Sequence, residues 1–135
     1  MKYIFLLGIA LLFLAAVEIF VLQRRKKLSE KDHVWVVIHW KNVTQKLAKE
    51  PARALTEADA ILDFVLKKRG FQGSLADKLR KADKIFTRID DVWTAHKLRN
   101  RAVHEVGFHI SEAEARRAIS SIQTALADIG VRVTL

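Results

Sequence analysis

The pattern of apolar and polar positions divides the chain into one long apolar run and a series of helical segments. Residues 3–22, YIFLLGIALLFLAAVEIFVL, are apolar except for Glu18. At a rise of 1.5 Å per residue, about 20 residues cross a hydrocarbon core of about 30 Å. Beyond residue 28, apolar residues recur at helical rather than alternating intervals. The pattern predicts an all-α protein, with an N-terminal transmembrane helix followed by an antiparallel four- to five-helix bundle.

Capping and turn residues give the expected bounds of the bundle helices. Ser29, Ser74 and the SEAE box at 111–114 are typical helix starts, and Pro51 suits a first helical turn. Glycines are typical of helix ends, and two of them stand where apolar stripes stop. We expect the first helix to run to about residue 49 and the second to end at Gly70. A short helix is expected to follow Ser74, and another to begin near residue 84 or 90. The last helix is expected to end at Gly130. The apolar stripe expected on the first helix comprises Val36, Val37, Trp40, Val43 and Leu47.

The charges that flank the apolar run predict how the chain lies in a membrane. QRRKK, residues 23–27, follows the run, whereas Lys2 alone precedes it. Basic flanks stay in the cytoplasm, so the rest of the chain is expected there. A cleaved signal peptide is the alternative, but its positive charge should precede the apolar run. We therefore expect residues 1–27 to form a single-pass anchor in the cell membrane and 28–135 to form a cytoplasmic helical domain.

Composition narrows the possible chemistry. The chain has no cysteine, which excludes disulfides, thiolate metal sites and a cysteine nucleophile. Of the net charge of +9, residues 1–27 contribute five basic and one acidic group, and residues 28–135 contribute 19 basic and 14 acidic groups. Juxtamembrane basic residues are attracted to anionic lipid. The remaining excess is compatible with binding a polyanion such as RNA or a nucleotide.

The stretch WTAHKLRNRAVHE, residues 93–105, carries many polar side chains on an expected helix. At about 100° per residue, Arg99 lies within the apolar stripe rather than opposite it. His96 lies beside Arg99, while Asn100 and His104 flank the same side on successive turns and are not expected in solvent. The residues expected to share the apolar stripe are Val92, Ala95, Ala102 and Val103, and those expected in solvent are Lys97 and Arg101.

An arginine directed at a core needs an anionic partner, because an unpaired buried charge is costly. Asp59 and Asp63 stand four residues apart and flank the apolar stripe of the preceding long helix. We expect them to be partners of Arg99 or Lys97. Two interpretations remain open at this point. Arg99 forms a structural ion pair with Asp59 while His104 caps a helix or binds a carbonyl, or these residues form a functional site.

RNRAVH, Arg99 to His104, resembles the R-N-x-x-x-H motif of HEPN domains, which are helical bundles. The wider pattern EADAILD, KRGFQGSLADKL and WTAHKLRNRAVHE is similar to small membrane-anchored bacterial proteins of unknown function. The HEPN resemblance implies a metal-independent endoribonuclease that commonly acts as a dimer. Arg99 would then hold the scissile phosphate, His104 would act as general base or acid toward the ribose 2′-hydroxyl, and Asn100 would orient one of these groups. Val106 stands where some HEPN toxins carry a tyrosine.

Other patterns carry less specific chemistry. His96, His104 and His109 lack the spacing of a metal site, and there is no Gly-rich phosphate loop, so no metal or cofactor is expected. The basic run from Lys78 to Arg88 is either a solvated face or a guide for RNA or lipid headgroups. Two functions are therefore predicted as alternatives. One is a membrane-anchored HEPN-like ribonuclease, which the resemblance implies acts as a homodimer. The other is a non-catalytic anchored module that binds a protein or nucleotide.

Overall fold

The computed structural model describes residues 6–15 and 27–135. Residues 6–15 form a helix. The elements of the following domain are α2 (Glu30–Lys46), α3 (Pro51–Lys68), α4 (Leu75–Lys81), the short 3-10 helix η1 (Asp83–Ile85), α5 (Ile89–His104) and α6 (Glu112–Asp128). No strand occurs in these described ranges, and the predicted all-helical bundle is confirmed.

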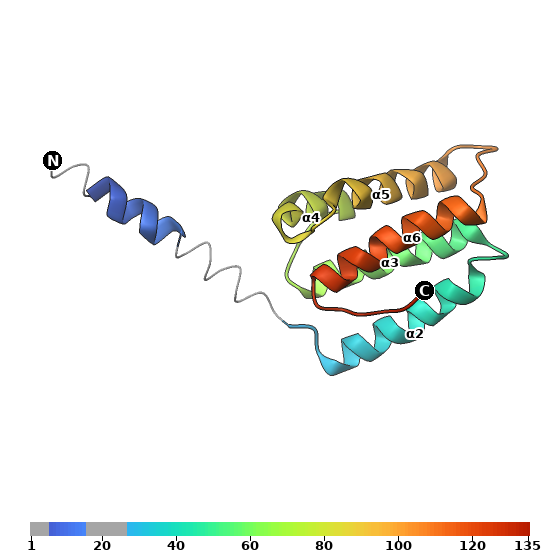
Figure 1. The fold of residues 1–135 in the computed structure, drawn as a ribbon, viewed down its shortest axis with the longest axis horizontal. Helices are drawn as coiled ribbons and strands as arrows, with labels where there is room; N and C mark the ends of the chain where they lie inside the picture. The colour runs from blue at the N-terminus through green and yellow to red at the C-terminus, as the bar shows by residue number, and fades with distance from the viewer. Residues whose placement is uncertain (1–5, 16–26) are drawn as a thin grey trace.

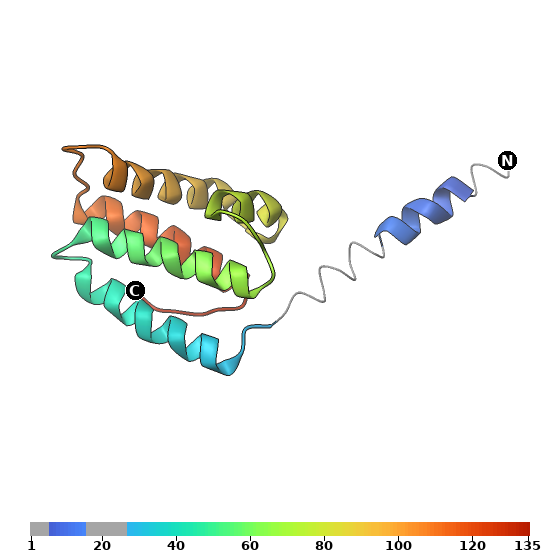
Figure 2. The same cartoon turned by 180° about the vertical axis from the view of Figure 1, so that it is seen from behind.

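The four long helices of the bundle run alternately in opposite directions, as the colours in Figure 1 show. α3 is the central helix, because it packs against α2, α5 and α6 and also contacts the short α4. α6 packs in turn against α5. Figure 2 shows the bundle from behind, with α3 in front of α6 and α2 along the outer edge. α5 is therefore held on two sides, by α3 and by α6.

The segment after α6 returns across the bundle toward α2, as both figures show. Trp40 Nε1 on α2 donates a hydrogen bond to the carbonyl oxygen of Thr134 at 3.0 Å. Gln123 Nε2 on α6 donates to the carbonyl oxygen of Val133 at 2.7 Å. Val131, at the start of this segment, is fully buried. Residues 131–135 thereby link the first and last helices of the bundle.

Most of the predicted apolar stripes form the core, with one exception on α2. Val36, Trp40, Val43 and Leu47 are buried as predicted, but the side chain of Val37 is 48% exposed. The buried positions follow spacings of four, three and four, which leave a narrow seam along α2. Val37 lies about 100° around the helix from Val36 and so falls outside that seam. α2 is thus covered on one side only.

Serine caps and glycines set helix bounds close to those predicted. Ser29 caps α2, and Ser74 and Ser111 form reciprocal capping boxes that open α4 and α6. Gly70 and Gly130 adopt φ values of 97° and 84° just beyond the ends of α3 and α6, a conformation that favours glycine. Local sequence signals therefore decide where most of these helices begin and end.

The segment predicted to span a membrane, residues 3–22, is only partly described. Residues 3–5 and 16–22 lie outside the described residues. No helix in the described part of the chain is both long and apolar enough to cross a bilayer. The described piece, residues 6–15, is helical and exposes large apolar side chains such as Leu12 and Phe13.

Candidate functional site

α3 and α5 bring four polar side chains together where the two helices pack. Asp59 projects from α3 between core residues, and its side chain is only 5% exposed. α5 contributes His96, Arg99 and Asn100, all partly buried. Asp59 follows the fully buried Ala58 in sequence, so the apolar stripe of α3 carries its carboxylate into the interface. The predicted proximity of Arg99 and Asp59 is present, but His96 is the closer partner of the carboxylate.

Contacts among these four side chains close into a ring, which we call the Asp59 ring. His96 Nδ1 lies 3.1 Å from each carboxylate oxygen of Asp59. Asn100 Nδ2 lies 3.2 Å from His96 Nε2. Arg99 Nη1 donates to Asn100 Oδ1 at 2.9 Å, and Arg99 Nε lies 3.4 Å from Asp59 Oδ2. Each member therefore contacts two others.

The directions of these hydrogen bonds follow from the arginine. A guanidinium only donates, so Asn100 accepts from Arg99 through its oxygen and must donate through Nδ2. His96 Nε2 then accepts and carries no proton in this arrangement, which places the ring proton on Nδ1, facing the Asp59 carboxylate. The ring therefore specifies one side-chain orientation for Asn100 and one tautomer for His96.

Solvent reaches Arg99 more than it reaches His96 or Asp59. The Arg99 side chain is 27% exposed, compared with 12% for His96. Among the described residues, no acceptor forms a hydrogen bond with the buried Arg99 Nε, so its contact with Asp59 is an ion pair without hydrogen-bond geometry. Arg99 thus lies in the apolar stripe as predicted, with its charge balanced inside the fold.

A cleft of about 400 Å³ opens beside the ring, between α3, α5 and the start of α4. Asp59, His96 and Arg99 of the ring line it, together with Asp63 and Ser74. The carboxylates and the guanidinium give this α3–α5 cleft a mixed charge. Polar and apolar side chains both line the cleft, and a small polar group could enter it from solvent.

Asp63 belongs to a separate ion pair rather than to the ring. Lys78 Nζ on α4 donates to Asp63 Oδ1 at 2.7 Å, and the Lys78 side chain is only 4% exposed. The prediction that Asp63 partners Arg99 or Lys97 is therefore wrong. The sequence places Lys78 in a basic run and does not predict its burial. The sequence feature that could have indicated its burial is its position beside Leu79, on the apolar side of a short amphipathic helix.

His104 lies away from both the ring and the cleft. It is the last residue of α5, it is exposed, and within the described residues it makes no hydrogen bond, ion pair or ring contact. The prediction that it avoids solvent is wrong, as is the placement of Val103 in the buried stripe, because Val103 is 50% exposed. Burial on α5 is complete only at Val92 and Ala95, so the final turns of the helix are less covered. Lys97 and Arg101 are exposed, as predicted.

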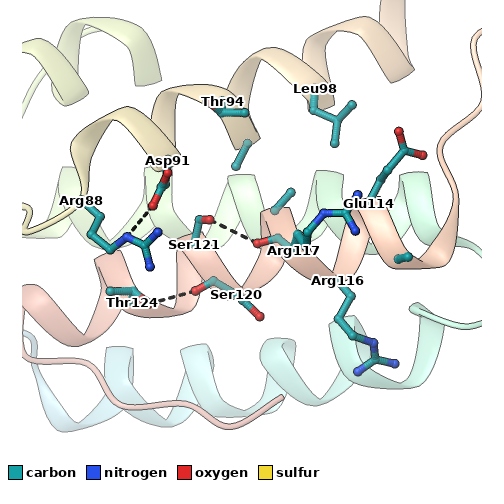
Figure 3. A pocket seen from close by; sticks show the side chains of 13 residues that line it. Arg88, Asp91, Thr94, Leu98, Glu114, Arg116, Arg117, Ser120, Ser121 and Thr124 are labelled. Atoms are coloured by element: carbon teal, nitrogen blue, oxygen red, sulfur yellow. Dashed lines mark hydrogen bonds and ion pairs between the residues drawn. The ribbon is translucent and has the colours of Figure 1, made fainter.

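A longer groove of about 780 Å³ runs along the other packed side of α5, between α5 and α6. Figure 3 shows Arg88 beside Asp91 at one end and Arg116, Arg117 and Glu114 toward the other. Arg88 Nε lies 2.5 Å from Asp91 Oδ2, and Arg116 Nη2 lies 2.7 Å from Glu112 Oε1 outside the groove. Arg88 comes from the basic run, whose Lys81 and Lys84 are also exposed. The α5–α6 groove is thus rich in arginine, but two of its arginines already have carboxylate partners.

No family model, curated protein or solved structure matches the chain. Within the described ranges, no group of three or more His, Cys, Asp or Glu side chains is placed to hold a metal ion. The geometry of the ring, the cleft and the groove is therefore the basis on which a function is argued.

Proposed function

We propose that the chain is a membrane-anchored helical module that binds a protein or nucleotide partner at the cytoplasmic face of the membrane. The Asp59 ring carries the structural part of this proposal. Arg99 and Asn100, the first two residues of the motif, contact Asp59, His96 and each other rather than pointing jointly into open solvent. Their sequence pattern is then explained by folding, because a ring of this kind fixes how α5 packs on α3.

The anchor is supported by the sequence and by the described part of its helix. About 20 apolar residues precede the basic run QRRKK, which is the pattern of a single span with a cytoplasmic C-terminal side. Residues 6–15 are helical, and their large apolar side chains are more than half exposed, as with Leu12 at 73%. A helix that is apolar on all sides is stable where lipid or protein surrounds it.

Replacing Arg99 tests the structural role of the motif. Arg99→Ala leaves the carboxylate of Asp59 with His96 as its only partner in the ring, and we expect a loss of about 2 kcal/mol in the free energy of unfolding. The matched control is Arg101→Ala on the same helix. Arg101 pairs with Glu105 at the surface at 3.1 Å, so we expect its loss to cost under about 0.5 kcal/mol. Equal stability of both variants in chemical denaturation would contradict the structural role.

A HEPN-like, metal-independent endoribonuclease is the second candidate function. His96, Asn100 and His104 recur every four residues and so lie along one side of α5, with His104 at its exposed end. A free, solvent-exposed imidazole is suited to proton transfer with a ribose 2′-hydroxyl. Val103 in the last turn of α5 and Val106 just beyond the helix are both exposed, and a second copy of the chain meeting this end would bring two His104 side chains together.

RNA cleavage in the presence of a chelator separates the two candidates. The full chain in lipid nanodiscs is compared with His104→Ala and with His109→Ala, which removes an exposed histidine outside the motif. Cleavage that leaves 2′,3′-cyclic phosphate ends, and is lost only in His104→Ala, would establish the nuclease. If the folded parent does not cleave RNA, the binding module stands. Cleavage that survives in His104→Ala would remove the catalytic assignment of His104.

A further inference from the structure

We propose that the outer face of α2 lies against the lipid surface beside the anchor. This face, which we call the outer α2 face, comprises Lys31, Val34, Val37, Ile38 and Lys41. The inference rests on the proposed membrane anchor and extends it, because it gives the bundle a defined orientation on the bilayer. The partner is a lipid bilayer that contains anionic headgroups.

Exposed apolar side chains on this face are the first observation. Val34, Val37 and Ile38 are 48%, 48% and 56% exposed, whereas the opposite side of α2 is buried in the core. At 100° per residue, the five residues of the outer α2 face span about 120° of the helix surface. Elsewhere in residues 27–135, the other large apolar side chains exposed to this degree are those of Val103 and Val106. Within this range, α2 is therefore the helix that exposes three large apolar side chains on one face.

The charges around the patch fit an anionic surface. Lys31 and Lys41 are exposed on the same face as the three apolar residues, and Lys27 precedes the helix. Of the nearby acidic residues, Asp32 forms an ion pair with Lys68 at 3.0 Å. Glu30, exposed in the first turn, falls within the same arc, where Lys31 and Lys41 outnumber it. Lysines that flank an apolar stripe are typical of helices that lie in the membrane interface.

The position of α2 in the chain keeps this face near the bilayer. Residues 23–29 separate the predicted span from α2, and seven residues reach at most about 24 Å when fully extended. A short tether raises the effective concentration of the tethered face at the surface to the millimolar range. Three half-exposed aliphatic side chains and two lysines then suffice for contact, although they would bind lipid weakly on their own.

Charge also favours lipid over a second copy of the chain as the occupant. If two outer α2 faces packed together, Lys31 and Lys41 of one copy would approach the same lysines of the other. Like charges at the rim of an interface oppose association. Three aliphatic side chains also make a small patch for a stable dimer interface, which buries about 800 Å² per partner.

The absence of cysteine from the chain allows a direct test by single labels. The full chain carrying Ile38→Cys is labelled with an environment-sensitive fluorophore and reconstituted in vesicles of phosphatidylcholine and phosphatidylglycerol. Lys97→Cys, at an exposed site on α5, is the matched control, and Leu12→Cys reports on the anchor. We expect spin-labelled lipid to quench the label at position 38 several-fold more than the label at position 97.

The outcomes separate this inference from the anchor on which it rests. Quenching at position 12 without quenching at position 38 leaves the anchor intact and overturns the docking of α2. No quenching at position 12 overturns the anchor, whatever position 38 shows. A label at position 38 that is shielded from water but not quenched by lipid means that a second copy or another protein covers the face, which also overturns the inference.

Charge reversal provides an independent check on the role of the lysines. Lys31→Glu with Lys41→Glu changes two exposed side chains and leaves the core of α2 untouched. In the Ile38→Cys background, we expect this pair to reduce lipid quenching at position 38 several-fold while quenching at position 12 stays unchanged. Undiminished quenching at position 38 would overturn the assignment of the lysines to anionic headgroups.

Discussion

The two ends of the RNRAVH motif lie in different environments, although they belong to one helix. At its start, Arg99 and Asn100 are joined to Asp59 and His96 in a ring between α3 and α5. At its end, His104 is exposed and, among the described residues, has no side-chain partner. One motif on one helix can thus hold residues that contact the core of the bundle and a residue that solvent surrounds. Arg99 and Asn100 already have partners within the bundle, whereas His104 is free to contact another molecule.

Among these variants, Asp59→Ala and His104→Ala are expected to differ most in the free energy of unfolding. Asp59→Ala removes the carboxylate that joins His96 and Arg99 and leaves a partly buried guanidinium without its anion. We expect a loss of about 3 kcal/mol in the free energy of unfolding. His104→Ala removes an exposed side chain and should change stability by under about 0.5 kcal/mol.

Chemical denaturation of the two variants measures both values under the same conditions. Asp59→Asn is an informative third variant, because it keeps the shape of the side chain and an oxygen that can accept from His96 Nδ1. It should be less damaging than Asp59→Ala. Similar stabilities for Asp59→Ala and His104→Ala would mean that the ring does not stabilise the fold.

Sequence reasoning predicted the angular placement of residues on α5 better than their burial. Arg99 lies in the stripe and near Asp59 as expected, because direction around a helix follows from spacing alone. The exposure of His104 could not be obtained in this way, since it depends on how much of the last turn the neighbouring helices cover. The main role of His96 in binding Asp59 was also missed, because it depends on the rotation of α3 relative to α5.

A second, smaller test uses the Lys78–Asp63 pair, in which the two charges differ in burial. The Lys78 side chain is 4% exposed and that of Asp63 is 39% exposed. Asp63→Ala leaves a buried ammonium without its anion, and we expect a loss of about 2 kcal/mol. Lys78→Met keeps most of the buried volume and leaves a carboxylate that water can solvate, so the loss should be under about 1 kcal/mol.

Thermal or chemical unfolding of these two variants checks whether burial decides the cost. A larger loss for Lys78→Met than for Asp63→Ala would contradict this account of the pair. The burial of Lys78 was not predicted because its basic neighbours made the segment look like a solvent-exposed basic run. The short helix α4 turns Lys78 inward beside Leu79, whereas Arg80 and Lys81 point to solvent.

The smallest expected effect comes from the exposed capping box that follows α5 in the chain. Hydrogen bonds from the backbone and side chain of Ser111 lower the pKa of Glu114 below its ordinary value. A carboxylate with a lowered pKa in the folded state stabilises the fold at neutral pH, and this contribution is lost as the pH falls through the folded-state pKa. Glu114→Gln should therefore be less stable than the parent at neutral pH. The difference should shrink in acid, as unfolding measured across the pH range would show.

The bounds of the helices were the most predictable part of the fold, because caps and glycines act within a few residues of sequence. Ser111 and Glu114 form the reciprocal bonds that their spacing predicted, and Ser74 caps α4 as expected, with Asp77 as a reciprocal partner that was not predicted. By contrast, Val37 was assigned to the core because it is apolar and adjacent to Val36. Only the packed structure shows that a single neighbouring helix and the C-terminal segment leave that side of α2 uncovered.

The bond between Trp40 and Thr134 has a consequence for the order in which the domain is completed. α2 leaves the ribosome well before residues 131–135, yet its indole nitrogen is paired only when those residues arrive. The contact spans 94 positions of sequence, which is a costly loop to close early in folding. During synthesis, part of the binding surface of α2 therefore stays unfilled until residues 131–135 arrive and join α2 to α6.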